Sequence, residues 1–181
     1  MQASIFHSVN SGLYICNGDA NVLIDGIHKG REKGFSEMPI KILDQMKKGK
    51  GIFDNLNNLL FTHDHSDHYN QEKLACFVKK SNRPISVYGG GIEAVHIQHI
   101  PISDNVEAVR MNGVVLLSMK TMHELNIYRN TVHRSFWVRI KDETFFVAGD
   151  AVLSAEHAKM IAGLTTHSIT GAFFQPIPDF V

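Results

Sequence analysis

The stretch LLFTHDHSDH, residues 59–68, decides the fold and the chemistry of this chain. Its first three residues are apolar and are typical of a buried strand, and the polar part that follows has the spacing H-x-H-x-D-H. Side chains two apart on a strand point the same way, so a strand end should hold His63 and His65 on one side, with Asp67 and His68 in the turn after it. Imidazole nitrogens and carboxylate oxygens are ligands that Zn²⁺ accepts. The stretch therefore predicts a metal site with room for two adjacent ions.

The motifs around this stretch resemble those of the metallo-β-lactamase fold superfamily. H-x-H-x-D-H after a short apolar strand is similar to the superfamily's metal-binding signature. NVLIDG at residues 21–26 resembles its strand ending in Asp-Gly, and FFVAGD at 145–150 resembles its later strand ending in Gly-Asp. The resemblance implies an α/β (α+β) fold, an αββα sandwich, in one domain over residues 1–181. Periodicity alone predicts only a mixed α and β domain.

The resemblance also implies a set of ligands. One metal would be held by His63, His65 and His123, and a second by Asp67 and His68, with Asp150 bridging the two. Asp67 is also the candidate catalytic residue, because it could orient the nucleophile. His133 competes with His123 for the third imidazole position. We favour His123, since it ends a predicted strand and matches the superfamily's His before a hairpin.

Two residues near the first metal motif are candidates for supporting roles. Asp25 could accept a hydrogen bond from a ligand imidazole and fix its tautomer, or it could simply be a strand-end residue in a tight turn with Gly26. His28 lies in the loop after that strand. It could face the metals or a substrate, or it could be an exposed loop residue.

The C-terminal part departs from the superfamily pattern. Members usually carry a further His after one more helix and strand, whereas only 31 residues follow Asp150 here. We expect the C-terminal helix and the last His-bearing strand to be missing, with His167 as a weaker candidate for the absent ligand. The apolar residues Phe173 and Phe174 would then lie on an uncovered face and favour a homodimer.

Hydrophobic patterning and turn residues predict the other elements. A helix is expected from Glu37 to Lys48, capped by Ser36, followed by helices near residues 71–80, 92–99 and 154–161. The predicted strands are residues 4–9, 13–16, 20–24, 59–62, 84–88, 106–110, 114–120, 135–140 and 144–148.

Composition excludes several classes of function. Lys and Arg together number 18, as do Asp and Glu, and no basic stripe with aromatics is present, so we expect no nucleic-acid partner. No apolar run reaches the roughly 18 residues of a membrane span, so no membrane partner is expected. The N-terminus has no basic region followed by an apolar one, and we expect a cytoplasmic protein.

The resemblance implies a metal-dependent hydrolase that uses a metal-bound hydroxide. Its substrate would be a small-molecule ester, lactone, thioester, amide or phosphodiester, and its cofactor one or two Zn ions, with Mn or Fe as alternatives. A di-iron oxygen chemistry is disfavoured, because those relatives have the pattern H-x-E-x-D-H and His65 stands at the Glu position. The alternative is a catalytically weak or inactive metal-binding scaffold with an incomplete second site.

Overall fold

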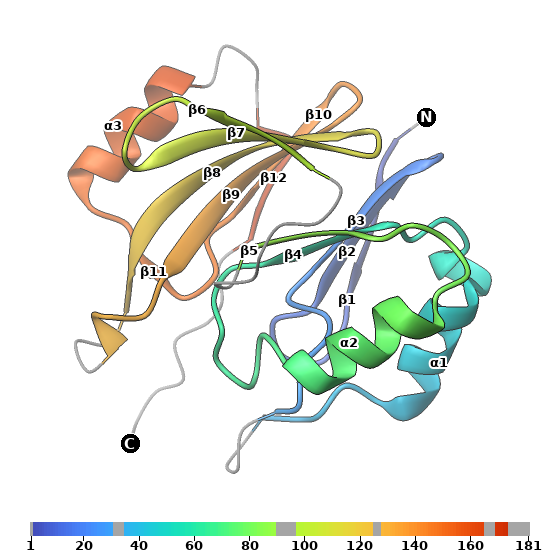
Figure 1. The fold of residues 1–181 in the computed structure, drawn as a ribbon. Coiled ribbons are helices and arrows are strands. Elements are labelled where there is room, and N and C mark those ends of the chain that lie inside the picture. Colours follow the sequence, from blue (N-terminus) through green and yellow to red (C-terminus); the bar gives the residue numbers. More distant parts are fainter. Residues whose placement is uncertain (1, 31–34, 90–96, 125–127, 165–168, 174–181) are drawn as a thin grey trace.

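The computed structural model describes residues 2–30, 35–89, 97–124, 128–164 and 169–173. Two β-sheets pack face to face, with α1 (Ile40–Lys48) and α2 (Gln71–Lys80) on the outer face of the first sheet and α3 (Ala155–Leu164) on the outer face of the second (Figure 1). This is the αββα sandwich that the resemblance of the sequence motifs implies.

The first sheet has five strands in the order of the sequence. They are β1 (Ser4–His7), β2 (Leu13–Asn17), β3 (Ala20–Ile24), β4 (Asn58–Phe61) and β5 (Ser86–Gly89). The first three are antiparallel, whereas β3, β4 and β5 run parallel to one another. Parallel neighbours need crossover connections, and here these contain α1 and α2. Because β3 and β4 end at the same edge, Asp25 and the H-x-H-x-D-H loop start side by side.

The second sheet is mostly antiparallel. It contains β6 (Gln98–Pro101), β7 (Val106–Met111), β8 (Val114–His123), β9 (His133–Ile140), β10 (Glu143–Val147), β11 (Ala151–Val152) and β12 (Gly171–Phe173). The order is β12-β10-β9-β8-β7-β6, and β11 pairs with the end of β8. In that pairing Ala151 lies opposite His123, so the register brings the end of β8 next to Asp150.

Both faces are largely buried in β2 to β5, β9 and β10, and the buried side chains of the sheets supply three apolar layers. The central layer joins the sheets through residues such as Ile15, Ile24, Val138 and Phe145. The other face of the first sheet packs on α1 and α2, and the other face of the second packs near α3. The two sheets are therefore held together by a continuous apolar core, which fixes the relative positions of the loops at their edges.

The start of α1 differs from the prediction. The helix begins at Ile40 with Pro39 at the N-cap position, and no side chain caps it. Proline disfavours helical backbone for the residue before it, so Met38 cannot continue the helix toward Glu37. Ser36, the predicted cap, does not cap the helix. Its backbone N–H instead donates a hydrogen bond to Asn10 Oδ1 at 3.0 Å.

Several other predicted bounds also change. The helix expected near 92–99 is wrong at its end, because residues 98–101 form β6, which is paired with β7; residues 90–96 lie outside the described part. The strand expected at 59–62 ends at Phe61, and β9 starts two residues early, at His133. Phe173 is half-buried and packs near Phe145, with ring centroids 6.5 Å apart, so it does not stand exposed. Phe174 lies outside the described residues.

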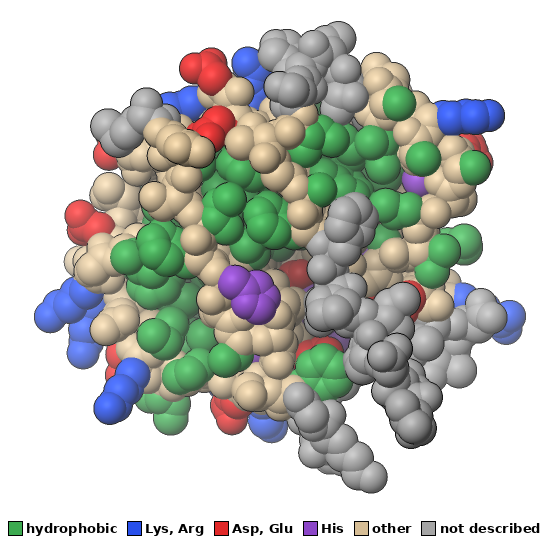
Figure 2. Space-filling model, turned by 180° about the vertical axis from the view of Figure 1, so that it is seen from behind, with side chains coloured by type: hydrophobic (Ala, Val, Ile, Leu, Met, Phe, Trp, Pro, Cys, Tyr) green, Lys and Arg blue, Asp and Glu red, His purple; other side chains and the backbone are tan. Residues whose placement is uncertain are grey.

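The face of the molecule opposite to the view of Figure 1 carries many hydrophobic side chains (Figure 2). An apolar groove of about 590 Å³ is lined by residues of β1, β2, β3 and α1 and by the short 3₁₀ helix Gly51–Phe53. None of the predicted site residues within the described part of the chain lines this groove. No helix within the described residues is long and apolar enough to cross a bilayer.

Candidate metal centre

The H-x-H-x-D-H motif lies in the loop between β4 and α2. The strand ends at Phe61, so His63 and His65 do not sit on a strand end as predicted; a turn carries the motif instead. The carbonyl of His65 accepts the backbone N–H groups of His68 and Tyr69, at 2.9 and 2.8 Å. Asn70 then caps α2 through its side chain, which accepts the Lys73 N–H. This hydrogen-bonded turn fixes the backbone from which the histidines project.

The structure brings five of the six predicted ligands into two overlapping groups. Within each group the potential ligand atoms all lie within 4.8 Å of one another; the groups are His63, His65 and His123, and His63, His68 and Asp150. The Asp150 carboxylate is 3.3 Å from His68 Nε2, 3.6 Å from His123 Nε2 and 3.9 Å from His63 Nε2. The loops after β4 and β10 and the end of β8 therefore converge on one buried polar cluster.

The protons in this cluster can be assigned from Thr62 and Asp25. Asp25 accepts the Thr62 N–H at 2.8 Å and the Thr62 hydroxyl at 2.7 Å. Because that hydroxyl proton is used, Thr62 Oγ1 must accept from His63 Nδ1 at 3.0 Å. His68 Nδ1 in turn donates to Asp25 Oδ2 at 2.9 Å. Both rings therefore carry a proton on Nδ1 and direct Nε2 toward Asp150.

Burial and the carboxylates have opposite effects on the pKa values of the two rings. Burial, together with the neighbouring imidazoles, lowers the pKa of His63 far below its usual range, so this ring is neutral. Burial also opposes protonation of His68, but the Asp25 and Asp150 carboxylates outweigh it and raise the pKa of that ring to about 10. Burial acts to raise the pKa of Asp150, yet its contacts with His68 lower it. Asp150 is therefore an anion among imidazoles.

The donor set fits a metal ion. His63 Nε2 is buried and has no hydrogen-bond partner among the described residues. A buried nitrogen lone pair without a proton donor is costly, and a cation held with the neighbouring imidazole and carboxylate groups would satisfy it. Asp25 would then act as the carboxylate that fixes the tautomer of a ligand histidine.

The remaining sequence candidates fall in different places. Asp67 is buried in the same loop, with its backbone carbonyl accepting the Ser11 hydroxyl, but among the described residues it belongs to neither ligand group. His28 is completely buried, so it is not an exposed loop residue, and burial lowers its pKa. His167 lies outside the described residues. The Asp67 and His167 roles therefore stay predictions.

His133 lies next to Asp150 but is outside both ligand groups of the described chain. Its Nε2 accepts the backbone N–H of Asp150 at 3.1 Å, and its Nδ1 is 2.7 Å from Thr121 Oγ1. Burial lowers the pKa of this ring to about 3, so it is neutral near pH 7. Of the two competing histidines, His123 is the one that the structure places among the candidate ligands.

Sequence reasoning gave no role to three further residues at the centre. Thr62 links Asp25 to His63, and Thr121 contacts His133. Tyr128 packs on His65 and His123, with ring centroids 4.4 and 4.9 Å apart. The position of Thr62 directly before the motif was a usable signal. Nothing in the spacing pointed to Tyr128, which reaches the cluster only through the fold.

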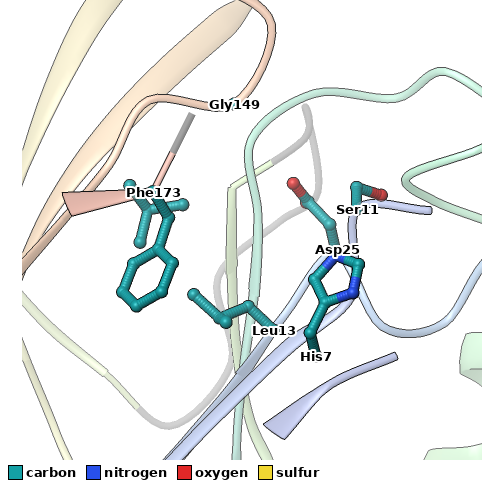
Figure 3. Close-up of a pocket in the computed structure, with 7 residues that line it drawn as sticks. His7, Ser11, Leu13, Asp25, Gly149 and Phe173 are labelled. Atoms are coloured by element: carbon teal, nitrogen blue, oxygen red, sulfur yellow. The ribbon is translucent and has the colours of Figure 1, made fainter. Parts of the chain in front are cut away.

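A small cavity of about 80 Å³ connects the supporting residues of the two sheets. Asp25 and Ser11 line it from the first sheet, and Gly149 and Phe173 from the second (Figure 3). Its volume is far below the roughly 300 Å³ at which pockets for small molecules begin. It is therefore too small to be a substrate pocket.

No protein-family model and no curated protein matches the chain. Solved structures do match. A possible metal-dependent hydrolase from Veillonella parvula superposes with a TM-score of 0.56 at 14% identity, covering 90% of this chain and 69% of that one. The E377D mutant of CmlA, a β-hydroxylase described as a diiron enzyme from Streptomyces venezuelae, gives 0.51 at 11% identity, covering 92% and 34%. The metallo-β-lactamase fold protein YhfI from Bacillus subtilis gives 0.47 at 12% identity, covering 78% and 55%.

The chain shares the fold of the Veillonella protein. The order of layers and the position of the motif loop after β4 agree with the resemblance seen in the sequence. The matched metallo-β-lactamase-fold and hydrolase structures are longer than this chain, which spans about two thirds of the Veillonella protein and about one third of the CmlA mutant. At these identities the matches establish the fold and leave the reaction to be argued from the site itself.

Proposed function

We propose that this chain is a metal-dependent hydrolase that acts on a small-molecule ester, lactone, thioester, amide or phosphodiester. One observation carries the proposal: two ligand groups converge on His63, within a buried cluster in which Thr62 and Asp25 engage the Nδ1 atoms of His63 and His68 and leave both Nε2 atoms facing Asp150. Such preorganisation is expected where a metal must be bound in a defined geometry.

The residues of the chain would divide the work. His63, His65 and His123 would hold one ion, and His68 and Asp150 would contribute to a second, with Asp67 as the candidate to complete it and to orient the nucleophile. Bound divalent ions would supply Lewis acidity, activating water and stabilising the charge that develops on the substrate. Asp25 and Thr62 would keep the imidazole rings oriented throughout. Zn is the favoured ion for this nitrogen-rich set, with Mn or Fe as alternatives.

The fold comparison supports this assignment at the level of architecture. The Veillonella protein, described as a possible metal-dependent hydrolase, shares the fold over 90% of the present chain. The competing proposal, a metal-binding scaffold without activity, is favoured by the position of Asp67, which belongs to neither ligand group in the described chain.

The test combines metal analysis with a substrate panel. Purified protein loaded separately with Zn²⁺, Mn²⁺ and Fe²⁺ would be assayed by elemental analysis and by hydrolysis of model esters, lactones, thioesters, amides and phosphodiesters. We expect bound metal and hydrolysis of at least one class, both lost in His63→Ala. His99→Ala is the matched control, because this histidine lies on β6 with its side chain 38% exposed.

Two results would decide against the hydrolase. Metal binding without hydrolysis of any class would favour the scaffold. No metal in the wild-type protein, or equal metal content in His63→Ala, would remove the metal centre itself.

A further inference from the structure

The turn between β10 and β11 determines where the Asp150 carboxylate points. It consists of Ala148, Gly149 and Asp150, and Gly149 has a φ of +62°. A Cβ atom at Gly149 would lie 2.9 Å from both His133 Nε2 and the Thr62 side chain. The backbone of this turn is therefore pressed against two residues of the centre, and it has little freedom to shift.

A series of hydrogen bonds leaves this turn and returns to it. The Asp150 N–H donates to His133 Nε2 at 3.1 Å, and His133 Nδ1 is 2.7 Å from Thr121 Oγ1. Thr121 Oγ1 is 3.1 Å from Ser135 Oγ, which donates to the Ala148 carbonyl at 2.8 Å. The series begins at the amide of Asp150 and ends at the carbonyl two residues earlier, so it closes around Gly149. We call these four links the Gly149 circuit.

Only one arrangement of protons satisfies every link. A backbone N–H can only donate, so His133 Nε2 must be the acceptor, and the neutral ring must carry its proton on Nδ1. Thr121 Oγ1 then accepts from His133 and donates to Ser135, which donates to Ala148. The three side chains are at most 9% exposed, so water cannot readily replace any of these partners.

We propose that His133 is a positioning residue: through the Gly149 circuit it holds the Asp150 amide and thereby aims the Asp150 carboxylate at His63, His68 and His123. The importance of this aim for metal binding rests on the proposed function, whereas the circuit itself does not. Because Nε2 is used by the Asp150 amide, His133 cannot ligate a metal through that atom without releasing the turn.

The geometry makes a prediction about the ring that needs no metal. In ¹⁵N-resolved NMR spectra of the metal-free wild-type protein at pH 7, His133 should show a protonated Nδ1 and an unprotonated Nε2. The Asp150 amide should be strongly protected from hydrogen exchange. A proton on Nε2, a doubly protonated ring or an unprotected Asp150 amide would overturn the circuit, whether or not the protein binds metal.

Substitutions then test the positioning role. His133→Leu removes the acceptor, so the Asp150 amide should lose protection and metal affinity should fall about 10–100-fold, the usual effect of removing an outer partner of a metal ligand. His133→Gln keeps an acceptor and a donor on one side chain and should restore most of the amide protection and the metal affinity.

If His133→Leu fails to fold, Thr121→Val breaks the next link of the circuit. Thr144→Val is the control, because Thr144 is equally buried on β10 and lies outside the circuit. Unchanged Asp150 protection and metal affinity in Thr121→Val and His133→Leu would refute the role. If the wild-type protein binds no metal, the proposed function fails while the ring and amide measurements still decide the circuit.

Discussion

Asp25 holds His68: its Oδ2 lies 2.9 Å from the Nδ1 atom of that ring. The same carboxylate accepts the Thr62 N–H and hydroxyl, so three donors converge on one buried side chain. Asp25 itself adopts a φ of +50°, a conformation that non-glycine residues seldom occupy. The strained backbone position thus carries the residue that orients the metal loop, in keeping with the tendency of strain to gather at functional sites.

The substitution Asp25→Asn should be costly even though it preserves shape. Asparagine tolerates positive φ, so the backbone can stay as it is. Its side-chain NH₂ group, however, is a donor and would point at the groups that now donate to the Asp25 carboxylate. At least one buried N–H or O–H would therefore be left without an acceptor. We expect the free energy of unfolding to fall by about 1–3 kcal/mol in urea titrations. Asp19→Asn, in an exposed turn, is the control. Equal effects of the two variants would contradict the contact.

Replacing Gly149 with alanine should destabilise the protein more than the same change at Gly51. Both glycines have a φ near +60°, so both variants bear the strain of an alanine in the left-handed region. A Cβ at Gly51 meets nothing within 4 Å, whereas at Gly149 it meets His133 and Thr62. We expect thermal or urea unfolding to show an extra loss of about 1–3 kcal/mol for Gly149→Ala. A difference near zero would show that the turn can relax.

Glu107 should make stability depend on pH. It accepts hydrogen bonds from the Tyr88 hydroxyl at 2.6 Å and pairs with Arg134 at 2.7 Å, which joins β5 of the first sheet to the second. Burial acts to raise the pKa of Glu107, but the contacts with Tyr88, His99 and Arg134 outweigh it and lower the pKa below its usual 4.5. A carboxylate with a lowered pKa stabilises the fold above about pH 4.5, and this contribution is lost as the pH falls through the folded-state pKa.

The variant Glu107→Gln should therefore be less stable than wild type by about 1–3 kcal/mol at pH 7, and the difference should shrink below pH 4.5. Urea unfolding at pH 7 and pH 4 would measure it. Glu72→Gln, on the exposed start of α2, is the control. A gap that stays constant with pH would mean that the charge of Glu107 does not matter.

Metal binding should stabilise the fold, because the ligand cluster forms only when both sheets are assembled. At a free Zn²⁺ concentration 100 times the Kd, the stabilisation is about 2.7 kcal/mol, which corresponds to a rise in Tm of about 5–10 °C for a chain of this size. A chelator should reverse the shift, and His63→Ala should abolish it. An undiminished shift in that variant would place the bound ion elsewhere.

Local patterns in the sequence were sufficient for most elements and for the location of the centre. The runs of strand-forming residues and the H-x-H-x-D-H spacing are both short-range signals. The first correspond to strands of the fold, and the second lies in the loop after β4. The predictions failed where a short-range signal was missed or absent. Pro39 should have ended the helix assignment before Ile40, and β6 is a strand because β7 pairs with it, which no local pattern records.

The sequence by itself determined the chemistry that is available: three imidazoles and two carboxylates in one loop, with His123 and Asp150 near the ends of later strands. The tertiary structure decided which atoms of these groups face one another. Asp25 and His68 are 43 residues apart, and Thr121 lies opposite His133 only through the register of β8 and β9. The tautomer of an imidazole depends on the partner of its other nitrogen, and that partner is supplied by a different strand. For this reason the sequence alone does not decide whether His133 binds the metal. Only the packed sheets make its Nε2 the acceptor of the Asp150 N–H.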